Sequence, residues 1–199
     1  MKQPESTFKN MVISLGGISI VAAVLLSWLN GVTQEPIKEA EFKSQTAAME
    51  KVMPAHDNNP FDEKFTTEVD GTEITIYPAT SGGKLAGAAV ESAADGFGGK
   101  ILVVYGFEAD GTVRDYSVLQ HTETPGLGSK MQEWFRDTQG QRSIIGHNPG
   151  NENMTVSKDG GSVDAITAAT ISSRAFLKTL DTAFKAYTDY SKQKGQDNE

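Results

Sequence analysis

The sequence predicts an α+β domain, a mainly antiparallel sheet flanked by helices, preceded by one N-terminal transmembrane helix. Three observations predict this arrangement. The first is a long stretch without charge near the N-terminus, and the second is a series of alternating segments separated by Asp-Gly pairs. The third is an amphipathic helical pattern close to the C-terminus. A chain of 199 residues is long enough for one such domain in addition to the anchor.

The segment from Met11 to Leu29 contains no charged residue. As a helix it would span about 28 Å, close to the hydrocarbon thickness of a bilayer. A cleaved secretory signal is the competing interpretation, but Trp28–Gly31 makes a poor cleavage site. We therefore expect a cytoplasmic N-terminus over residues 1–10, a transmembrane helix over 11–31 and an extracytoplasmic domain over 32–199.

The charges around this span predict its orientation. Lys2 and Lys9 precede it with only Glu5 against them, whereas the charges that follow are mixed. This bias places the N-terminus in the cytoplasm and the domain on the periplasmic or outer side of a bacterial inner membrane. Small residues on one face of the span favour packing against other membrane helices. These residues are Gly16, Ser19, Ala23 and Ser27.

After the anchor, Pro36 can occupy the first turn of a helix that we expect to reach about Val52. Alternating hydrophobicity then predicts four strands, with hairpin turns at Asp70-Gly71 and Asp110-Gly111. The predicted strands cover residues 73–77, 85–92, 100–107 and 113–121. A short helix is expected from Ser129 to Arg136.

Apolar residues near the C-terminus recur at helical spacing and predict an amphipathic helix with one buried stripe. The stripe consists of Phe176, Leu180, Ala183, Phe184 and Tyr187. The polar residues 192–199 that follow are expected to fray.

The composition excludes several classes of chemistry. The chain has no cysteine, which excludes disulfides, iron–sulfur clusters and thiolate zinc sites. Its three histidines, His56, His121 and His147, do not have helical ligand spacing, so we expect no protein-bound metal. A net charge of −8 argues against a nucleic-acid partner. Redox chemistry in this chain would therefore need an organic cofactor.

The loop His121–Gly128 directly follows the last predicted strand. Pro125 fixes φ, while Gly126 and Gly128 allow positive φ and a close backbone approach. Such a loop can present backbone N–H groups and threonine hydroxyls to a ligand. An ordinary strand-to-helix turn would use the same residues, and composition alone favours that simpler interpretation.

The segment Asp164–Ser173 comes just before the amphipathic helix. Its threonines and serines are natural N-caps, and spacing alone favours a capping role. The same place also suits a phosphate, because unpaired N–H groups and the positive end of the dipole meet at a helix start. Ala168 and Ala169 leave room for a bulky group beside Thr170.

Taken together, these segments resemble the G subunit of the Rnf electron transport complex. They are also similar to the C subunit of the sodium-pumping NADH:quinone oxidoreductase, which shares the FMN-binding domain. Thr167–Thr170, preceded by Asp164, matches the family's S/T-G-A-T flavinylation motif, and His121–Gly128 matches its H-x-E-T-P-G-L-G loop. Gly96–Gly99 resembles the family's glycine-rich turn. Ala168 stands where the family usually has glycine, and alanine would be strained there if φ is positive; we expect a tolerated variant.

The resemblance implies that FMN is joined through its phosphate to the hydroxyl of Thr170. A separate flavin transferase would install it from FAD, and Asp164 would belong to the sequence that this enzyme recognises. Thr170 would then be an acceptor of modification, so no catalytic residue is predicted. The protein would relay electrons within a complex that couples ferredoxin:NAD oxidoreduction to ion movement, and would not be a stand-alone enzyme.

The loop is expected to pack against the flavin, mainly through Glu123, Thr124 and Leu127. The backbone N–H of Ile171 is expected to help hold the phosphate, and Lys130 to offset its charge. The complete predicted cofactor site consists of Thr170, Thr167, Ala168, Ala169, Ile171, Asp164, His121, Glu123, Thr124, Pro125, Gly126, Leu127, Gly128 and Lys130.

Three other functions remain open at this point. The chain could be the C subunit of the quinone reductase, an FMN protein of another electron pathway, or an anchored extracytoplasmic binding domain without redox work. The compact chain and the short link from anchor to domain favour the Rnf protein. A bound flavin would exclude the non-redox alternative.

Overall fold

The computed structural model describes residues 7–196 of the chain. The predicted cytoplasmic N-terminus therefore lies largely outside the described residues, as do Lys2 and Glu5, on which the predicted orientation partly rests. Residues 197–199 of the predicted polar tail also lie outside them. By its internal contacts the chain divides into two compact units, Met1–Gln45 and Thr46–Glu199.

Helix α1 runs without interruption from Phe8 to Val52, and of the described helices it alone is long and apolar enough to cross a membrane. It ends where the sequence predicted, but the expectation that a separate helix begins at Pro36 is wrong, because Pro36 lies inside α1. A proline within a helix removes one hydrogen bond, at a cost of about 3 kcal/mol. The Glu-, Ala- and Lys-rich residues after Pro36 are strong helix formers that offset this cost.

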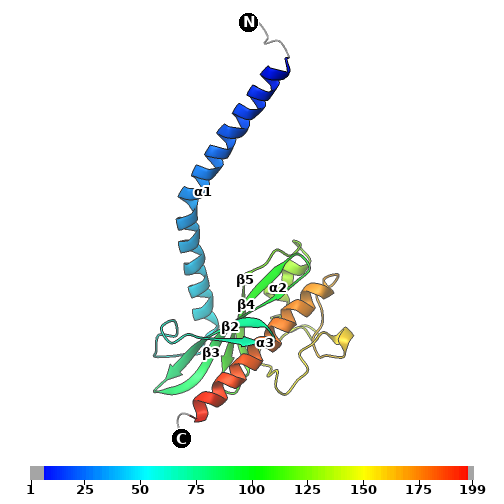
Figure 1. The fold of residues 1–199 in the computed structure, drawn as a ribbon. Helices are drawn as coiled ribbons and strands as arrows, with labels where there is room; N and C mark the ends of the chain where they lie inside the picture. The colour runs from blue at the N-terminus through cyan, green and yellow to red at the C-terminus, as the bar shows by residue number, and fades with distance from the viewer. Residues whose placement is uncertain (1–6, 197–199) are drawn as a thin grey trace. The chain divides into compact units, whose positions relative to one another are not determined.

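The second unit contains a five-stranded antiparallel sheet in which the strands follow one another in chain order (Figure 1). Four strands were predicted, and the short edge strand β1 was not. The sequence of β1, Phe-Thr-Thr-Glu-Val, lacks a clear apolar alternation because most of its side chains are exposed. The strands are β1 (Phe65–Val69), β2 (Thr72–Ser81), β3 (Lys84–Asp95), β4 (Lys100–Glu108) and β5 (Val113–Gln120).

The predicted turn between β1 and β2 is confirmed. Asp70 and Gly71 both have positive φ, 52° and 75°, as a two-residue hairpin turn of the favoured hand requires. The second predicted turn, between β4 and β5, contains Gly111 with φ 86°. There the Thr112 N–H donates to the Asp110 carboxylate at 2.9 Å, and this bond lowers the pKa of Asp110.

One face of the sheet is covered by helix α3, Thr170–Gln196 (Figure 1). The predicted stripe is confirmed, since four of its residues are buried and Phe184 is partly buried against the same core. Tyr105 of β4 donates a hydrogen bond to the Phe176 carbonyl at 3.0 Å. Phe176 also stacks on Phe135, with the ring centroids 4.3 Å apart. These contacts fix the first turns of α3 on the sheet.

The other face of the sheet carries a smaller core. Met49, Val52 and Met53 pack there against small residues of the strands. The backbone approaches closely at Gly106 of β4, where a Cβ would lie 1.8 Å from the Val52 carbonyl oxygen. Only glycine permits this contact, which ties the end of α1 to the centre of the sheet.

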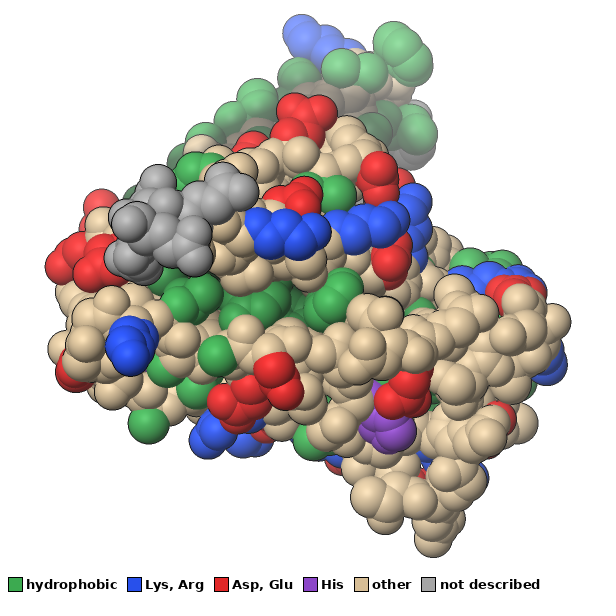
Figure 2. Space-filling model, turned by 90° about the horizontal axis from the view of Figure 1, so that it is seen from below, with side chains coloured by type: hydrophobic (Ala, Val, Ile, Leu, Met, Phe, Trp, Pro, Cys, Tyr) green, Lys and Arg blue, Asp and Glu red, His purple; other side chains and the backbone are tan. Residues whose placement is uncertain are grey.

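The surface charges are mixed. On the face drawn in Figure 2, acidic and basic side chains are interspersed around a strip of hydrophobic side chains. The net charge of −8 is therefore not gathered into one acidic patch on this face.

Candidate functional site

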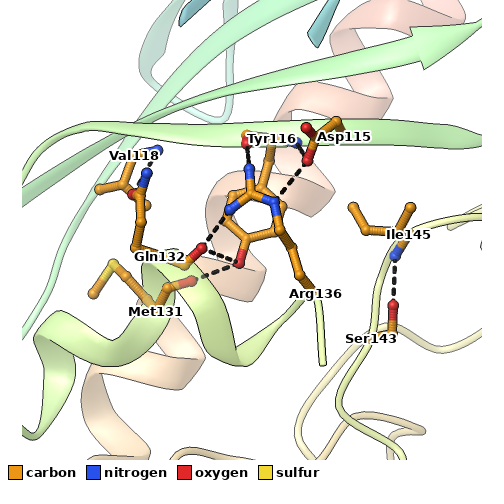
Figure 3. A network of polar contacts seen from close by, with 8 residues as sticks. All are labelled: Asp115, Tyr116, Val118, Met131, Gln132, Arg136, Ser143 and Ile145. Carbon is orange, nitrogen blue, oxygen red and sulfur yellow. Dashed lines mark hydrogen bonds and ion pairs between the residues drawn. The ribbon is translucent and has the colours of Figure 1, made fainter. Parts of the chain in front are cut away.

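The loop after β5 leads into two short helical turns, where the sequence predicted one helix. These are η1 (Gly128–Lys130) and α2 (Met131–Trp134). Arg136 holds them against β5, because its guanidinium lies 4.1 Å from the centre of the Tyr116 ring and its Nε donates to Asp115 at 2.9 Å (Figure 3). Tyr116 in turn donates its hydroxyl to the Met131 carbonyl at 2.6 Å. Burial raises the pKa of the Tyr116 hydroxyl still further above neutrality.

The glycine-rich turn between β3 and β4 packs against the start of this loop. The Thr122 hydroxyl donates to the Gly98 carbonyl at 2.8 Å, and the Gly98 N–H donates to Oε1 of Glu123 at 2.9 Å. A Cβ on Gly98 would lie 2.3 Å from the Thr122 carbonyl oxygen, so a side chain there would push the two segments apart. The turn that the sequence singled out thus forms one structure with the loop.

Glu123 joins this pair of segments to helix α3. Its second carboxylate oxygen, Oε2, accepts a hydrogen bond of 2.5 Å from the Ser172 hydroxyl, in the first turn of α3. Glu123 is only 5% exposed. Sequence reasoning named Glu123 but missed Ser172, which has no signal beyond its place in a Thr- and Ser-rich run.

Ser173 shapes the segment just before α3. Its hydroxyl accepts from the Ile166 N–H at 2.9 Å and lies 3.0 Å from the Ala169 carbonyl. Between these two residues the chain turns sharply, and Ala168 takes a φ of +62°. The condition for strain at Ala168 is therefore met, because a left-handed conformation costs an L-residue about 1–2 kcal/mol.

The three segments enclose a pocket of about 390 Å³. A volume of this size suits a cofactor-sized organic ligand. Phe97 from the glycine-rich turn lines the pocket and was not predicted as a site residue. The remaining lining residues are Glu123, Thr124, Leu127, Gly128, Ala168, Ala169, Thr170, Ile171 and Ser172.

The rim of the pocket is apolar and open. Phe97, Leu127 and Ile171 are large hydrophobic residues that are nevertheless exposed, with 69% of Phe97 accessible to solvent. Exposed apolar side chains around a concave site favour a flat, hydrophobic ligand, which would cover them. Thr170, the first residue of α3, also lines this pocket.

Other predicted residues lie outside this pocket. Asp164 and Thr167 line a separate hollow that meets the first pocket at Ala168. The Asp164 carboxylate accepts hydrogen bonds from the Gln141 N–H at 3.1 Å and from the Ser157 hydroxyl at 3.3 Å, so it braces the backbone. The other predicted residues that do not line the pocket are His121, Pro125, Gly126 and Lys130.

His121 has a local contact: its Nδ1 accepts the Glu123 N–H at 3.3 Å. Pro125, Gly126 and Lys130 are exposed, and none of the pocket-lining residues is cationic. The loop as a whole is thus brought to the site, while individual members of it face solvent.

Comparison with known proteins agrees with this geometry. The sequence pattern of the FMN-binding domain family matches residues 96–185, a range that includes every residue lining the pocket. The chain thus contains an FMN-binding domain, and the pocket lies within it.

The full-length relatives are more specific. The chain is 36% identical to the G subunit of the ion-translocating oxidoreductase complex of Cereibacter sphaeroides, over 83% of this chain and 78% of the relative. The corresponding protein of Stutzerimonas stutzeri is 32% identical over 83% of this chain and 75% of the relative. That of Aliivibrio fischeri is 30% identical over 94% of both chains. This chain belongs to the family of the G subunits of ion-translocating oxidoreductase complexes, which confirms the resemblance found in the sequence.

Proposed function

We propose that this chain is the flavin-carrying electron-transfer subunit of a membrane-bound ion-translocating oxidoreductase complex. FMN occupies the pocket and is bonded through its phosphate to the hydroxyl of Thr170. The observation that carries this proposal is the position of Thr170, which lies on the pocket wall at the first residue of α3.

The surroundings of Thr170 suit a phosphate ester. Among the described residues, the N–H groups of Ile171 and Ser172 have no backbone partner, as is usual in the first turn of a helix. Such groups, together with the positive end of the helix dipole, stabilise a phosphate.

Three hydroxyls close to Thr170 in the sequence, those of Thr167, Ser172 and Ser173, are less suitable as the attachment point. The Ser172 hydroxyl is bonded to Glu123, and the Ser173 hydroxyl is bonded within the turn before α3. Thr167 is exposed and lines the separate hollow. Thr170 has no side-chain hydrogen bond within the described residues, so esterification there breaks no interaction of the fold.

The pocket residues position the cofactor in this proposal. When bound, FMN supplies the ring that accepts and releases electrons. Phe97 and Leu127 provide apolar surface for that ring, and the open rim leaves an edge accessible to redox partners. A covalent tether keeps the effective concentration of the flavin high on the outer side of the membrane, where a dissociated cofactor would be lost.

The maturation and location follow from the same proposal. A flavin transferase breaks the pyrophosphate bond of FAD, joins the FMN phosphate to the Thr170 hydroxyl oxygen and releases AMP, and Asp164 belongs to the segment that it recognises. Residues 11–31 cross the bacterial inner membrane with the N-terminus in the cytoplasm, and the domain lies on the periplasmic or outer side. The apolar side chains of this span are exposed on α1, which leaves them available to lipid and to other membrane proteins of the complex.

The test is intact-mass analysis of the full-length chain co-expressed with a matching flavin transferase. We expect the wild type and the control Thr138→Ala to gain the mass of FMN minus water, since Thr138 lies outside the pocket. Thr170→Ala is expected to keep the unmodified mass. FMN retained covalently by Thr170→Ala would exclude this attachment site.

A further inference from the structure

The flavin pocket contains one buried charge. Of the described residues that line it, only Glu123 has an ionisable side chain. Its carboxylate forms no ion pair with any lysine, arginine or histidine of residues 7–196. Burying a carboxylate without a cationic partner is costly. Because Glu123 is almost completely buried and lines a ligand pocket, we expect its position to serve the function of that pocket.

Glu123 contacts two hydrogen-bond donors, one at each carboxylate oxygen. The Gly98 N–H can only donate, so Oε1 is an acceptor. The Ser172 hydroxyl has no other partner in the described part of the chain, and its proton therefore points to Oε2. Both carboxylate oxygens of Glu123 thus accept a hydrogen bond, one from the backbone and one from a hydroxyl.

Two glycines leave the space that this carboxylate fills. A Cβ on Gly96 would lie 2.2 Å from Oε1, and one on Gly128 would lie 2.5 Å from Oε2. The carboxylate is thus packed against the backbone at Gly96 and Gly128, and the Ser172 side chain of α3 contacts it as well. Its position relative to the pocket is fixed before any cofactor arrives.

We infer that Glu123 is a fixed negative charge that lowers the reduction potential of the flavin. The inference rests on the proposed function, since it requires FMN in this pocket. Two-electron reduction of FMN with uptake of one proton gives the ring one additional negative charge. An anion held against the ring in a pocket with apolar walls opposes that change, because Coulomb repulsion is weakly screened there. The electrons are supplied by an external reductant, which is dithionite in the test below.

The variant Glu123→Gln removes the carboxylate and keeps a side chain of nearly the same size and shape. Its amide oxygen can accept the Gly98 N–H and its NH₂ group can donate to the Ser172 oxygen, so both contacts survive. Glu68→Gln is the matched control, because it makes the same change in net charge at an exposed residue of the edge strand β1. Full-length protein matured with the transferase is titrated with dithionite, and the flavin absorbance gives the midpoint potential.

We expect Glu123→Gln to have a more positive potential than the wild type. At a fixed ambient potential its ratio of reduced to oxidised flavin should rise about tenfold, which corresponds to ~30 mV for a two-electron couple. Glu68→Gln should match the wild type. An unchanged or more negative potential in Glu123→Gln would overturn the inference.

Intact masses separate this inference from the proposed function. If the wild type carries no FMN, the proposed function fails; if both proteins carry FMN and their potentials agree, only the role of Glu123 fails. Ser172→Ala provides a second test that keeps the carboxylate but removes one of its donors. Because the Glu123 carboxylate then has one hydrogen-bond donor fewer, the potential of the flavin should become more negative. A shift in the other direction, or no shift, would contradict the inference. This second variant keeps the inference testable even if Glu123→Gln does not fold.

Discussion

Two of the three segments around the pocket, here called its walls, differ in their backbone conformation. In the wall formed by the loop 121–128, positive φ occurs only at a glycine, Gly126, with φ 76°. In the wall formed by the segment 164–170, of which only Ala168–Thr170 line the pocket, the residue with positive φ is Ala168. In the first wall the positive φ falls on a glycine, which adopts it without strain. In the second wall it falls on an alanine, so backbone strain is stored beside the residue that we propose as the attachment point. Strain of this kind persists only where the surroundings over-determine the conformation, as Ser173 does here.

The largest effect is expected from Gly128→Ala in the unstrained wall. The new Cβ would lie 2.5 Å from Oε2 of Glu123 and 2.6 Å from Oγ of Ser172, so it must break the bond between them. We expect a loss of about 2 kcal/mol in the free energy of unfolding, together with weaker flavin retention. Thermal unfolding of the full-length chain in detergent measures this.

Gly126→Ala is the control for Gly128→Ala. Nothing lies within 4 Å of a Cβ at Gly126, so this change adds only backbone strain. It should cost about 1 kcal/mol, less than Gly128→Ala. Equal losses in the two variants would show that packing around Glu123 does not hold this wall.

A smaller effect, of opposite sign, is expected from Ala168→Gly in the strained wall. Glycine adopts φ +62° without a steric penalty. We expect the free energy of unfolding to rise by about 1 kcal/mol, the strain relieved less the entropy that glycine adds to the unfolded chain. The same measurement on Ala169→Gly should show destabilisation, because Ala169 is buried and is not among the positive-φ residues. A destabilised Ala168→Gly protein would contradict strain at this position.

The smallest effect concerns the ion pair between Asp159 and Arg174, beyond the strained wall. The Arg174 guanidinium donates two hydrogen bonds of 2.7 Å to the Asp159 carboxylate, which lowers the pKa of Asp159. A carboxyl group whose pKa is lowered by folding contributes stability above its unfolded pKa of about 4, and this contribution is lost as the pH falls through the folded value. Because both side chains are exposed, salt screens the contribution.

Asp159→Asn tests this contribution. The variant should be slightly less stable than the wild type at neutral pH, and the difference should shrink as the pH falls below about 4. The difference at neutral pH should shrink in high salt. A stability difference that persists in acid would mean that the Asp159 side chain stabilises this region by something other than its charge.

The same contrast between the walls explains what the sequence could predict. The strands β2 to β5, their Asp-Gly turns and the stripe of α3 follow from local periodicity and turn chemistry, and the structure has all of them. The edge strand β1 was missed because it has no buried alternation, and the continuous α1 because Pro36 is a breaker whose effect its neighbours override. Local patterns predict elements well and their exceptions poorly.

For the site, motifs predicted which segments meet but not which atoms do. Phe97 and Ser172 line the pocket without a sequence signal, since both depend on how three distant segments pack. Asp164 and Thr167 belong to the same motif as Thr170 yet lie in a separate hollow, because the turn at Ala168 redirects the chain. From the sequence we could say only that Ala168 would be strained if its φ were positive. The structure was needed to show that it is positive.

The most direct test of the central claim is to locate the flavin on the chain. Trypsin cuts after Lys158 and Arg174 and releases the peptide 159–174, which contains the whole strained wall. In protein matured with the transferase, we predict that this peptide carries the mass of FMN minus water and that fragmentation assigns it to Thr170. FMN on any other residue, or an unmodified peptide from fully matured protein, would contradict the account.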